Sequence, residues 1–201
     1  MKLYYSPGAC SMSPHIALLE AGLPFTAVKA PTKTHQLDDG TDYYTINPLG
    51  YVPLLELDDG TRITEGPAIV QYIADQVPAK NLAPANGSLA RYQLQSWLTF
   101  IGTELHKGFS PLFNPATPEE YKKIAIDKLL GRLKHVDAQL AGKSYLMGDD
   151  FSVADGYLFT VTNWAPRVGV DISGLANIAA FRARMMTRPA VQAAMKAEGF
   201  M

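Results

Sequence analysis

One change in the hydrophobic pattern, near residue 80, constrains the fold of this chain more than any other feature. Before that point, short apolar runs alternate with helical segments in the order strand, helix, strand, strand, strand, helix. After it, every apolar pattern has a helical period. The sequence therefore predicts an α/β domain over residues 1–80 and an all-α domain over 87–201, joined by a linker rich in proline and alanine.

Turn and capping residues set the expected bounds within the first domain. Pro7-Gly8 ends the first strand, Ser13-Pro14 begins a helix, and Asp58-Asp59-Gly60 separates two extended runs as a hairpin turn does. The expected elements are a strand at 2–6, a helix at 13–22, a strand at 25–29, a hairpin of 51–57 and 61–64, and a helix from Gly66-Pro67 to about 77.

The second domain is predicted to consist of helices only. Residues 88–109 are expected to form one long helix. A capping box at Thr117–Glu120, with Pro118 at the first helical position, begins the next helix, and a box at Ser152–Asp155 begins one that runs to about Val168. Two shorter helices are separated at Arg188-Pro189. The helix after Pro118 is expected to bury one stripe, formed by Ile126, Leu129, Leu133, Val136 and Leu140.

The bulk composition narrows the class of protein. The 201 residues include 18 basic and 19 acidic side chains, for a net charge of −1, and no basic block indicates nucleic-acid binding. No apolar run has the length of a membrane span, and the N-terminus lacks the long apolar region of a signal peptide. A single cysteine excludes an internal disulfide, so we expect a cytoplasmic protein, with no metal site.

Cys10 is the first candidate for chemistry. It lies in a Gly-Ala-Cys-Ser loop between a strand and a helix start, where the partial positive charge of the helix stabilises a thiolate. Cys10-Ser-Met-Ser13 has the spacing of a thioredoxin-type redox pair, with serine in place of the second cysteine. Such a site needs an outside thiol to resolve a mixed disulfide, and glutathione is the abundant one. The alternative is an inert packed cysteine.

Two further features of the first domain suit a peptide-like ligand. Pro53 has no backbone N–H, so it cannot donate a hydrogen bond to a neighbouring strand. A cis Val52-Pro53 bond would turn the Val52 backbone toward an extended ligand. Glu65-Gly66 precede a helix whose free N–H groups favour a carboxylate, while Glu65 can take an ammonium, so a zwitterionic amino-acid end fits. An ordinary edge-strand proline and a charged helix cap are the alternatives.

A polar row on the long helix is the last candidate. Thr99, Thr103 and His106 stand at i, i+4 and i+7 and therefore share one helical face, which could meet a ligand held by the first domain. From periodicity alone, a solvated stripe is the better interpretation.

These residues together are similar to those of a known family. The ordered set of the Cys10 loop, Val52-Pro53, Glu65-Gly66, Glu104-Leu-His-Lys107 and the Ser152–Asp155 box resembles the bacterial beta-class glutathione transferases over essentially the whole chain. The resemblance implies a thioredoxin-like N-terminal domain, an all-α C-terminal domain and a homodimer. It also implies a detoxification enzyme that joins glutathione, its co-substrate, to small hydrophobic electrophiles.

The resemblance further implies a glutathione site shared by the two domains. Val52, beside Pro53, would pair its backbone with the cysteinyl part of glutathione, while Glu65 and Gly66 would hold the γ-glutamyl end. Cys10 would lie near the ligand sulfur. The remaining residues that the resemblance assigns to this site, some of them across the dimer interface, are His35 at the glycyl end, Thr99, Thr103, Glu104 and His106.

The chain departs from the family pattern at three positions. His35 replaces a lysine, Thr99 replaces an amide, and Gly66 lacks a serine hydroxyl. His35 is largely neutral at neutral pH, so it attracts the glycine carboxylate less than a lysine would. We expect weaker glutathione binding than in a typical member.

Conjugation requires the glutathione thiolate, which hydrogen-bond donors and a positive local field stabilise. The candidate donors are the Cys10 region and His106, with Tyr5 as a third, although strand packing is the preferred interpretation of Tyr5. Two alternatives remain open. One is a disulfide reductase or reductive dehalogenase that uses a Cys10–glutathione mixed disulfide, and the other is a non-catalytic carrier of hydrophobic ligands.

Overall fold

Two compact units make up the chain, and a computed structural model describes both over residues 1–201. The first unit contains residues 1–83 together with 187–201, and the second contains residues 84–186. The sequence pattern places everything after residue 87 in one helical domain. In the structure the last helix, α8 (Pro189–Ala197), instead belongs to the first unit, where it packs against α1 (Met12–Ala21).

The first unit is built on a four-stranded mixed sheet in the order β2-β1-β3-β4. Its strands are β1 (Lys2–Tyr5), β2 (Thr26–Lys29), β3 (Leu54–Glu56) and β4 (Arg62–Thr64). Strand β1 is parallel to β2, as a strand–helix–strand unit requires, and antiparallel to β3. Strands β3 and β4 pair as an antiparallel hairpin, which confirms that expectation.

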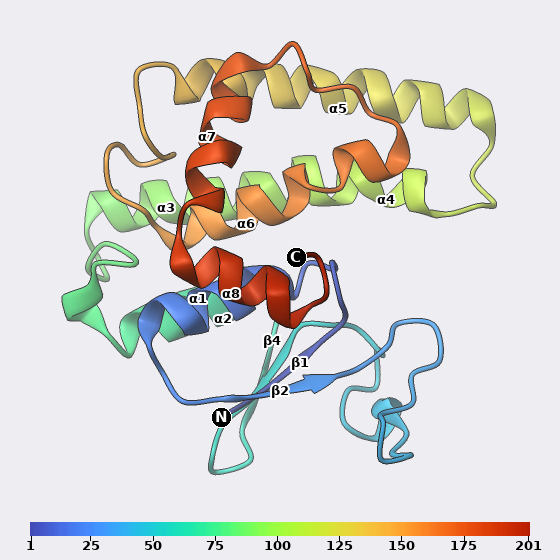
Figure 1. Ribbon diagram of the computed structural model, residues 1–201, viewed down its shortest axis with the longest axis vertical. Helices are drawn as coiled ribbons and strands as arrows, with labels where there is room; N and C mark the ends of the chain where they lie inside the picture. The colour runs from blue at the N-terminus through green and yellow to red at the C-terminus, as the bar shows by residue number, and fades with distance from the viewer. The chain divides into compact units, whose positions relative to one another are not determined.

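Three helices cover one face of this sheet: α1, α8 and α2 (Gly66–Asp75) (Figure 1). Helix α1 ends as expected, since Gly22 adopts a left-handed φ of 68° that glycine tolerates at no steric cost. Helix α2 begins at Gly66 with Pro67 in its first turn and buries one apolar face against the sheet. Two short 3₁₀ helices, Tyr43–Thr45 and Pro78–Lys80, complete the unit.

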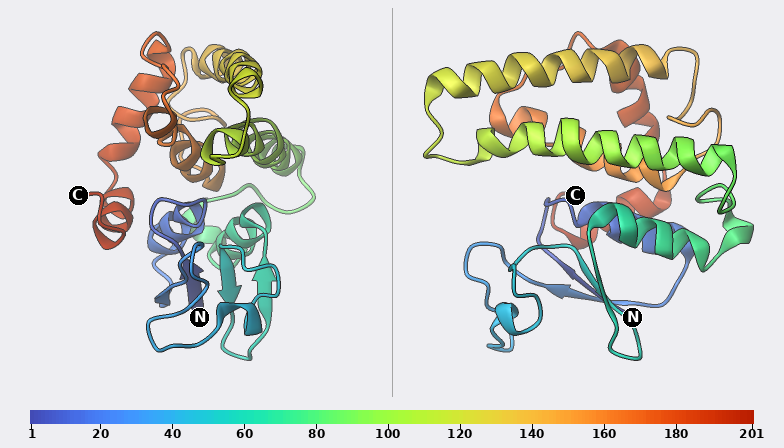
Figure 2. Two further views of the ribbon diagram at one scale, coloured as in Figure 1. Left: turned by 90° about the vertical axis from the view of Figure 1, so that its right-hand side faces the viewer. Right: turned by 180° about the vertical axis from the view of Figure 1, so that it is seen from behind.

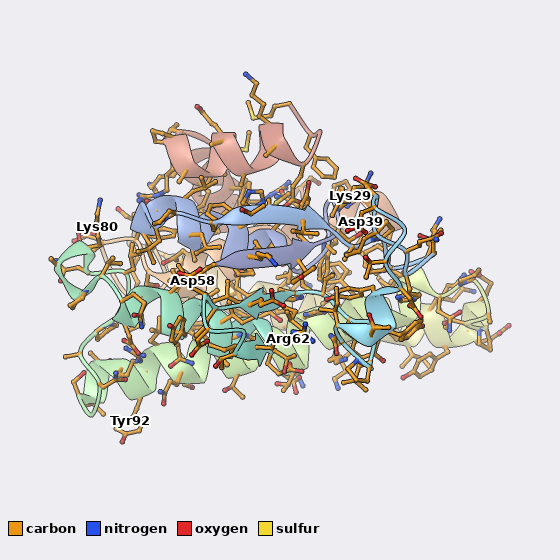
Figure 3. All side chains as sticks on the ribbon, turned by 90° about the horizontal axis from the view of Figure 1, so that it is seen from below. Lys29, Asp39, Asp58, Arg62, Lys80 and Tyr92 are labelled. Atoms are coloured by element: carbon orange, nitrogen blue, oxygen red, sulfur yellow. The ribbon has the colours of Figure 1, made fainter.

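The opposite face of the sheet carries charged side chains. Figure 3 looks onto this face and labels Arg62 and Asp58 on the hairpin. Glu56 accepts hydrogen bonds from both Lys2 and Arg62, each at 3.0 Å. These exposed ion pairs contribute little stability, so the fold of the unit depends mainly on its apolar helix-covered face.

The second unit consists of helices only. Its elements are α3 (Leu89–Phe100), a π-helical segment (Ile101–His106), α4 (Lys107–Phe113), α5 (Glu119–Leu140), α6 (Val153–Thr162), a 3₁₀ turn (Ala165–Val168) and α7 (Ala176–Met186). In Figure 2, α3, the π-helical segment and α4 form one continuous rod with α5 alongside.

The expectation of a single regular helix over 88–109 is wrong in one respect. The rod is continuous, but its hydrogen bonding changes to the wider π pattern between Ile101 and His106. Gly102 lies in this segment. Glycine is about 1 kcal/mol less favourable than alanine inside a regular α-helix, and only proline is less favourable. The wider turn changes the angular spacing of every side chain that follows.

The start of α5 also differs from the expectation. Pro118 was predicted at the first helical position behind a Thr117 cap, but it has an extended ψ of 143° and is itself the N-cap, without a capping side chain. Because a residue that precedes proline avoids the helical region, Thr117 lies outside the helix. Four residues of the expected stripe are buried, Leu129, Leu133, Val136 and Leu140, while Ile126 is half-buried.

Helix α6 is the centre of the second unit, since all ten of its residues are buried. The hydroxyls of Thr160 and Thr162 donate to the carbonyls of Gly156 and Leu158 at 2.8 and 2.9 Å, which satisfies them inside the apolar core. The helix ends at Thr162, six residues before the expected end, and the chain then continues into the 3₁₀ turn.

The expected capping box at the start of α6 is confirmed. Asp155 is fully buried, and its carboxylate accepts hydrogen bonds from the Ser152 amide, the Ser152 hydroxyl and the Leu146 amide, each at 2.8 Å. One carboxylate therefore fixes both the helix start and the preceding loop. None of the helices in either unit combines the length and apolar character needed to cross a membrane.

We predict that Asp155→Ala lowers the free energy of unfolding more than Ser152→Ala does. Loss of Asp155 leaves two buried amides without an acceptor, at a cost of about 3 kcal/mol, whereas loss of the serine cap costs about 1 kcal/mol. Urea denaturation of each variant measures the difference. Asp150→Ala, an exposed change nearby, is the control. Equal stability of the Asp155 variant and this control would contradict the capping interpretation.

Candidate active site

The loop that carries Cys10 is held by hydrogen bonds on both sides of the cysteine. The buried Ser11 hydroxyl accepts from the Ser6 amide at 3.1 Å and donates to the Ser6 carbonyl at 3.2 Å. The Ser13 amide donates to the Cys10 carbonyl at 3.1 Å as α1 begins. Cys10 itself is half-buried and directly precedes Ser11, the N-cap of α1, so the helix begins at Met12, one residue before the expected start at Ser13.

The Cys10 side chain meets the second candidate feature directly. Its thiol donates to the Val52 carbonyl over 3.2 Å, although the residues are 42 positions apart. The Val52-Pro53 peptide bond is cis. Cys10 and the cis-proline turn therefore form one local site in the first unit.

The backbone before Val52 is fixed by two side chains that the sequence interpretation did not identify. The buried Tyr43 hydroxyl and the buried Asn47 amide both donate to the Tyr51 carbonyl, at 2.9 and 2.8 Å. Asn47 also accepts from the Leu49 amide at 3.2 Å. The Asn47-Pro48 turn signal was visible in the sequence, but the partner of its side chain was not. These contacts hold the Val52 backbone in position.

The start of α2 lies next to the cis-proline turn. A Cβ placed on Gly66 would lie 3.8 Å from the Pro53 ring, so the two residues are neighbours. Glu65 is exposed and makes no capping bond to α2, which disfavours the charged-cap interpretation. Its φ of 64° and ψ of 110° are unusual for a residue with a side chain, and such conformations concentrate at functional sites.

His35 lies farther along the same unit, in the long irregular segment before β3. Its ring packs on Tyr44 with centroids 4.5 Å apart, and its Nδ1 is buried without a hydrogen-bond partner. The site of a Cβ on Gly50 would lie only 2.8 Å from that Nδ1, so the absence of a side chain at Gly50 makes room for the imidazole. The ring is therefore held by packing on its Nδ1 side.

Glu198 directly follows α8 and joins the end of that helix to the loop that carries Cys10. Its buried carboxylate accepts from the Gly8 amide at 2.8 Å and lies 2.9 Å from the Nδ1 atom of His15. Arg188 at the start of α8 makes a two-bond pair with Glu20 of α1, at 2.6 and 2.9 Å. No local sequence pattern marks Glu198, because its amide partner is 190 residues away.

Tyr5 lies at the end of β1 and is half-buried against the His15 ring, with centroids 5.6 Å apart. Burial raises the pKa of its phenol, with smaller contributions from the carboxylates of Glu198 and Asp38. The phenol therefore keeps its proton at neutral pH. This environment agrees with the packing role that the sequence favoured.

The polar row on the long helix is only partly formed. Thr99 and Thr103 are exposed on one face, and the Thr103 hydroxyl donates to the Thr99 carbonyl at 3.0 Å. Glu104 accepts from Arg132 of α5 at 2.7 Å, and this bond lowers the pKa of the Glu104 carboxyl. His106 follows Thr103 in the π-helical segment but, unlike the two exposed threonines, it is half-buried.

The half-buried His106 ring packs on one side against residues of the second unit. Its Nδ1 lies 2.7 Å from the Tyr157 hydroxyl of α6, and its ring meets Trp164 edge to face with centroids 4.9 Å apart. Burial, and to a smaller extent the charge of Lys107, lowers the pKa of His106 to about 4. The imidazole is therefore neutral near pH 7 and can donate one hydrogen bond and accept another.

These features define a class of protein: a thioredoxin-like α/β unit with a cysteine beside a cis-proline turn, accompanied by a helical unit. Comparison with known proteins agrees. Residues 8–76 match the family model described as "Glutathione S-transferase, N-terminal domain", and residues 100–189 match "Glutathione S-transferase, C-terminal domain".

Individual relatives cover the whole chain. The curated glutathione S-transferase GstA of Escherichia coli O157:H7 is 50% identical over 99% of both chains. A sphingomonad glutathione S-transferase solved in complex with glutathione is 49% identical, with a TM-score of 0.96 over all of both chains. A bacterial beta-class enzyme of Sphingomonas chungbukensis is 48% identical, also with a TM-score of 0.96 over all of both chains.

The chain belongs to the glutathione S-transferase family. The beta-class resemblance and the expected fold, a thioredoxin-like domain with an all-α domain, are both confirmed.

We predict that His106 makes the protein less stable in acid. Its folded pKa of about 4 lies below the ordinary value of 6.5, so the unfolded chain takes up a proton first as the pH falls. The stability linked to neutral His106 is complete above pH 6.5 and is lost progressively toward pH 4. Unfolding free energies of the protein and its His106→Gln variant, measured across this range, should converge or cross as the pH falls. A difference that is constant with pH would contradict the lowered pKa.

Proposed function

We propose that the protein is a glutathione transferase that joins glutathione to a small hydrophobic electrophile. The observation that carries this proposal is the hydrogen bond between the Cys10 thiol and the carbonyl of Val52, beside a cis proline. It joins a sulfur-bearing loop to the backbone edge that an extended peptide would pair with. The family supplies the ligand, since a relative 49% identical was solved in complex with glutathione.

Glutathione is proposed to bind along the first unit in an extended form. The Val52 backbone pairs with the cysteinyl residue, and because a carbonyl has two lone pairs, Val52 can accept a ligand N–H as well as the Cys10 thiol. The exposed carboxylate of Glu65 takes the γ-glutamyl ammonium, and the α2 start at Gly66 takes the carboxylate. His35 is the proposed contact of the glycyl end.

The chemical step transfers the sulfur of glutathione. Its thiol gives up a proton to solvent, the thiolate forms a bond to an electrophilic carbon, and a leaving group such as halide departs with the bonding electron pair. Donors that face the sulfur stabilise the thiolate more than the thiol and so lower the thiol pKa. The helix-start amides of the Cys10 region and the neutral imidazole of His106 are the proposed donors, because the single proton of the Cys10 thiol is directed to Val52. Thr99, Thr103 and Glu104 are proposed neighbours in the second unit.

Tyr5 and Glu104 are each engaged by a neighbouring side chain. The phenol of Tyr5 is occupied by packing against His15, although its raised pKa keeps a donor proton available. The carboxylate of Glu104 is paired with Arg132. We therefore propose that Tyr5 and Glu104 shape the site rather than act on the sulfur.

Thiol–disulfide exchange is a second candidate function, favoured by the half-buried and therefore accessible state of Cys10. In this reaction the Cys10 thiolate attacks the glutathione sulfur of a mixed disulfide between glutathione and a substrate thiol, forms a Cys10–glutathione disulfide and releases the substrate thiolate. The thiolate of a second glutathione then attacks the glutathione sulfur of that disulfide, which forms glutathione disulfide and releases the Cys10 thiolate. No structural feature separately favours reductive dehalogenation or a non-catalytic carrier.

We also propose a cytoplasmic homodimer. The family resemblance suggests the dimer, and large apolar side chains support it: Leu49 and Tyr51 in the first unit are 65% and 66% exposed, and Leu89 in the second is 76% exposed. Such side chains commonly mark protein interfaces. The single cysteine and the proposed use of reduced glutathione fit the reducing cytoplasm.

We predict that Cys10→Ala separates two reactions. Exchange with hydroxyethyl disulfide should be abolished, because it requires a protein sulfur. Conjugation to an aryl halide such as 1-chloro-2,4-dinitrobenzene should fall by about tenfold or less, the effect of one lost hydrogen bond, because the reacting sulfur belongs to glutathione. Cys10→Ser, which keeps a donor, should retain more conjugation than Cys10→Ala while losing exchange equally.

Both rates are measured on the same preparations. Loss of conjugation as complete as loss of exchange would make Cys10 an essential activator of bound glutathione. Retention of both activities would show that Cys10 is a packing residue. Absence of conjugation by the unaltered protein with several aryl halides would contradict the proposed function itself.

A further inference from the structure

Tyr157, which lies outside the proposed site, places its hydroxyl against the His106 ring. Its hydroxyl lies 2.7 Å from His106 Nδ1, a short distance for this type of bond. The tyrosine is 4% exposed and lies on α6, whose ten residues are all buried. A contact of this length in a rigid, buried helix fixes one side of the imidazole.

Aromatic packing fixes the plane of the same ring. Trp164 and Tyr157 both meet it nearly perpendicularly, at 73° and 84°, with centroids 4.9 and 6.0 Å away. Trp164 is itself packed edge to face by Phe109 and Phe113, each at 5.7 Å. The ring therefore cannot flip to exchange its two nitrogens without disturbing several buried side chains.

The chemistry of the two partners sets the direction of the hydrogen bond. A phenol O–H is a stronger acid than the N–H of a neutral imidazole, and an imidazole nitrogen is a stronger base than a phenol oxygen. Because His106 is neutral at pH 7, one of its nitrogens is free to accept. The favoured arrangement has the Tyr157 hydroxyl donating to Nδ1, which leaves the single ring proton on Nε2.

We propose that Tyr157 is a positioning residue that holds His106 as the neutral Nε2–H tautomer, so that His106 acts as a hydrogen-bond donor and not as a base. This inference rests on the proposed role of His106 toward the glutathione sulfur. A neutral donor fixed in orientation stabilises the thiolate without the cost of burying a second charge. The thiol proton then leaves to solvent, because Nδ1 is already occupied by Tyr157.

Nitrogen NMR of protein labelled in histidine tests the tautomer directly. The chain has four histidines, so the His106 signals are assigned as those missing from His106→Gln. At pH 7 we expect His106 to have a protonated Nε2 and an unprotonated, hydrogen-bonded Nδ1. In Tyr157→Phe the Nδ1 loses its donor, and the signals should move to a mixture of tautomers. An Nδ1-protonated His106, or an unchanged tautomer in Tyr157→Phe, would overturn the proposal.

A double-mutant cycle tests whether Tyr157 acts through His106. Tyr157→Phe should lower kcat/KM for conjugation by about 3- to 10-fold, the range expected for one neutral hydrogen bond. In the His106→Gln background the same change should have no further effect. An equal loss in both backgrounds would mean that Tyr157 acts independently of His106 and would overturn the proposal.

Tyr145→Phe is the matched control, since Tyr145 is another buried tyrosine of the second unit, 7% exposed, that packs on Phe151 and not on His106. It should lower the melting temperature by a similar amount and leave the His106 tautomer unchanged. The two proposals fail separately. An inactive wild type with the predicted tautomer would contradict the transferase function, whereas an active wild type with Nδ1 protonated would contradict only this inference.

Discussion

The proposed site depends on the hydrogen bond between the Cys10 thiol and the Val52 carbonyl. This bond joins two loops whose bonded residues are 42 positions apart in the sequence. Each loop is fixed separately by other bonds. Ser11 closes the loop on the Cys10 side, and Tyr43 and Asn47 hold the Tyr51 carbonyl on the other. The distance between sulfur and backbone edge is therefore set by rigid neighbours, as an active site requires.

The last helix extends this arrangement to the end of the chain. Glu198 connects α8 to the amide of Gly8, two residues before Cys10, and Arg188 connects the start of the same helix to α1. A carboxylate that is buried with two polar partners fixes a loop more strongly than an exposed one, since water does not compete for it. This explains why residues 187–201 group with the first unit although they follow the helical one.

Local signals predicted much of this structure. The Gly22 stop, the Asp-Asp-Gly turn, the Pro67 helix start and the Ser152–Asp155 box each act over a few residues, so their effects were visible in the sequence. Cys10, Val52 and Glu65 were identified for the same reason, since each lies at an element boundary. The family resemblance supplied the ligand and the roles of the residues.

What the sequence could not predict depends on contacts between distant residues. Glu198 and Tyr157 look like ordinary helical residues until their partners, Gly8 and His106, are brought beside them. The π-helical turn at Ile101–His106 has no periodic signature, since it leaves the apolar spacing of Ile101, Leu105 and Phe109 compatible with a regular helix. It nevertheless changes the angular spacing on which the expectation of one common face for Thr99, Thr103 and His106 was based.

Amide hydrogen exchange at Val52 tests the central claim most directly, because the claim is that this backbone pairs with the cysteinyl part of glutathione. At glutathione concentrations shown by calorimetry to saturate the protein, exchange of the Val52 N–H should become clearly slower. The Thr61 amide, bonded to Asp59 within the distant hairpin turn, should keep its rate. Saturated binding with an unchanged rate at Val52 would contradict the account.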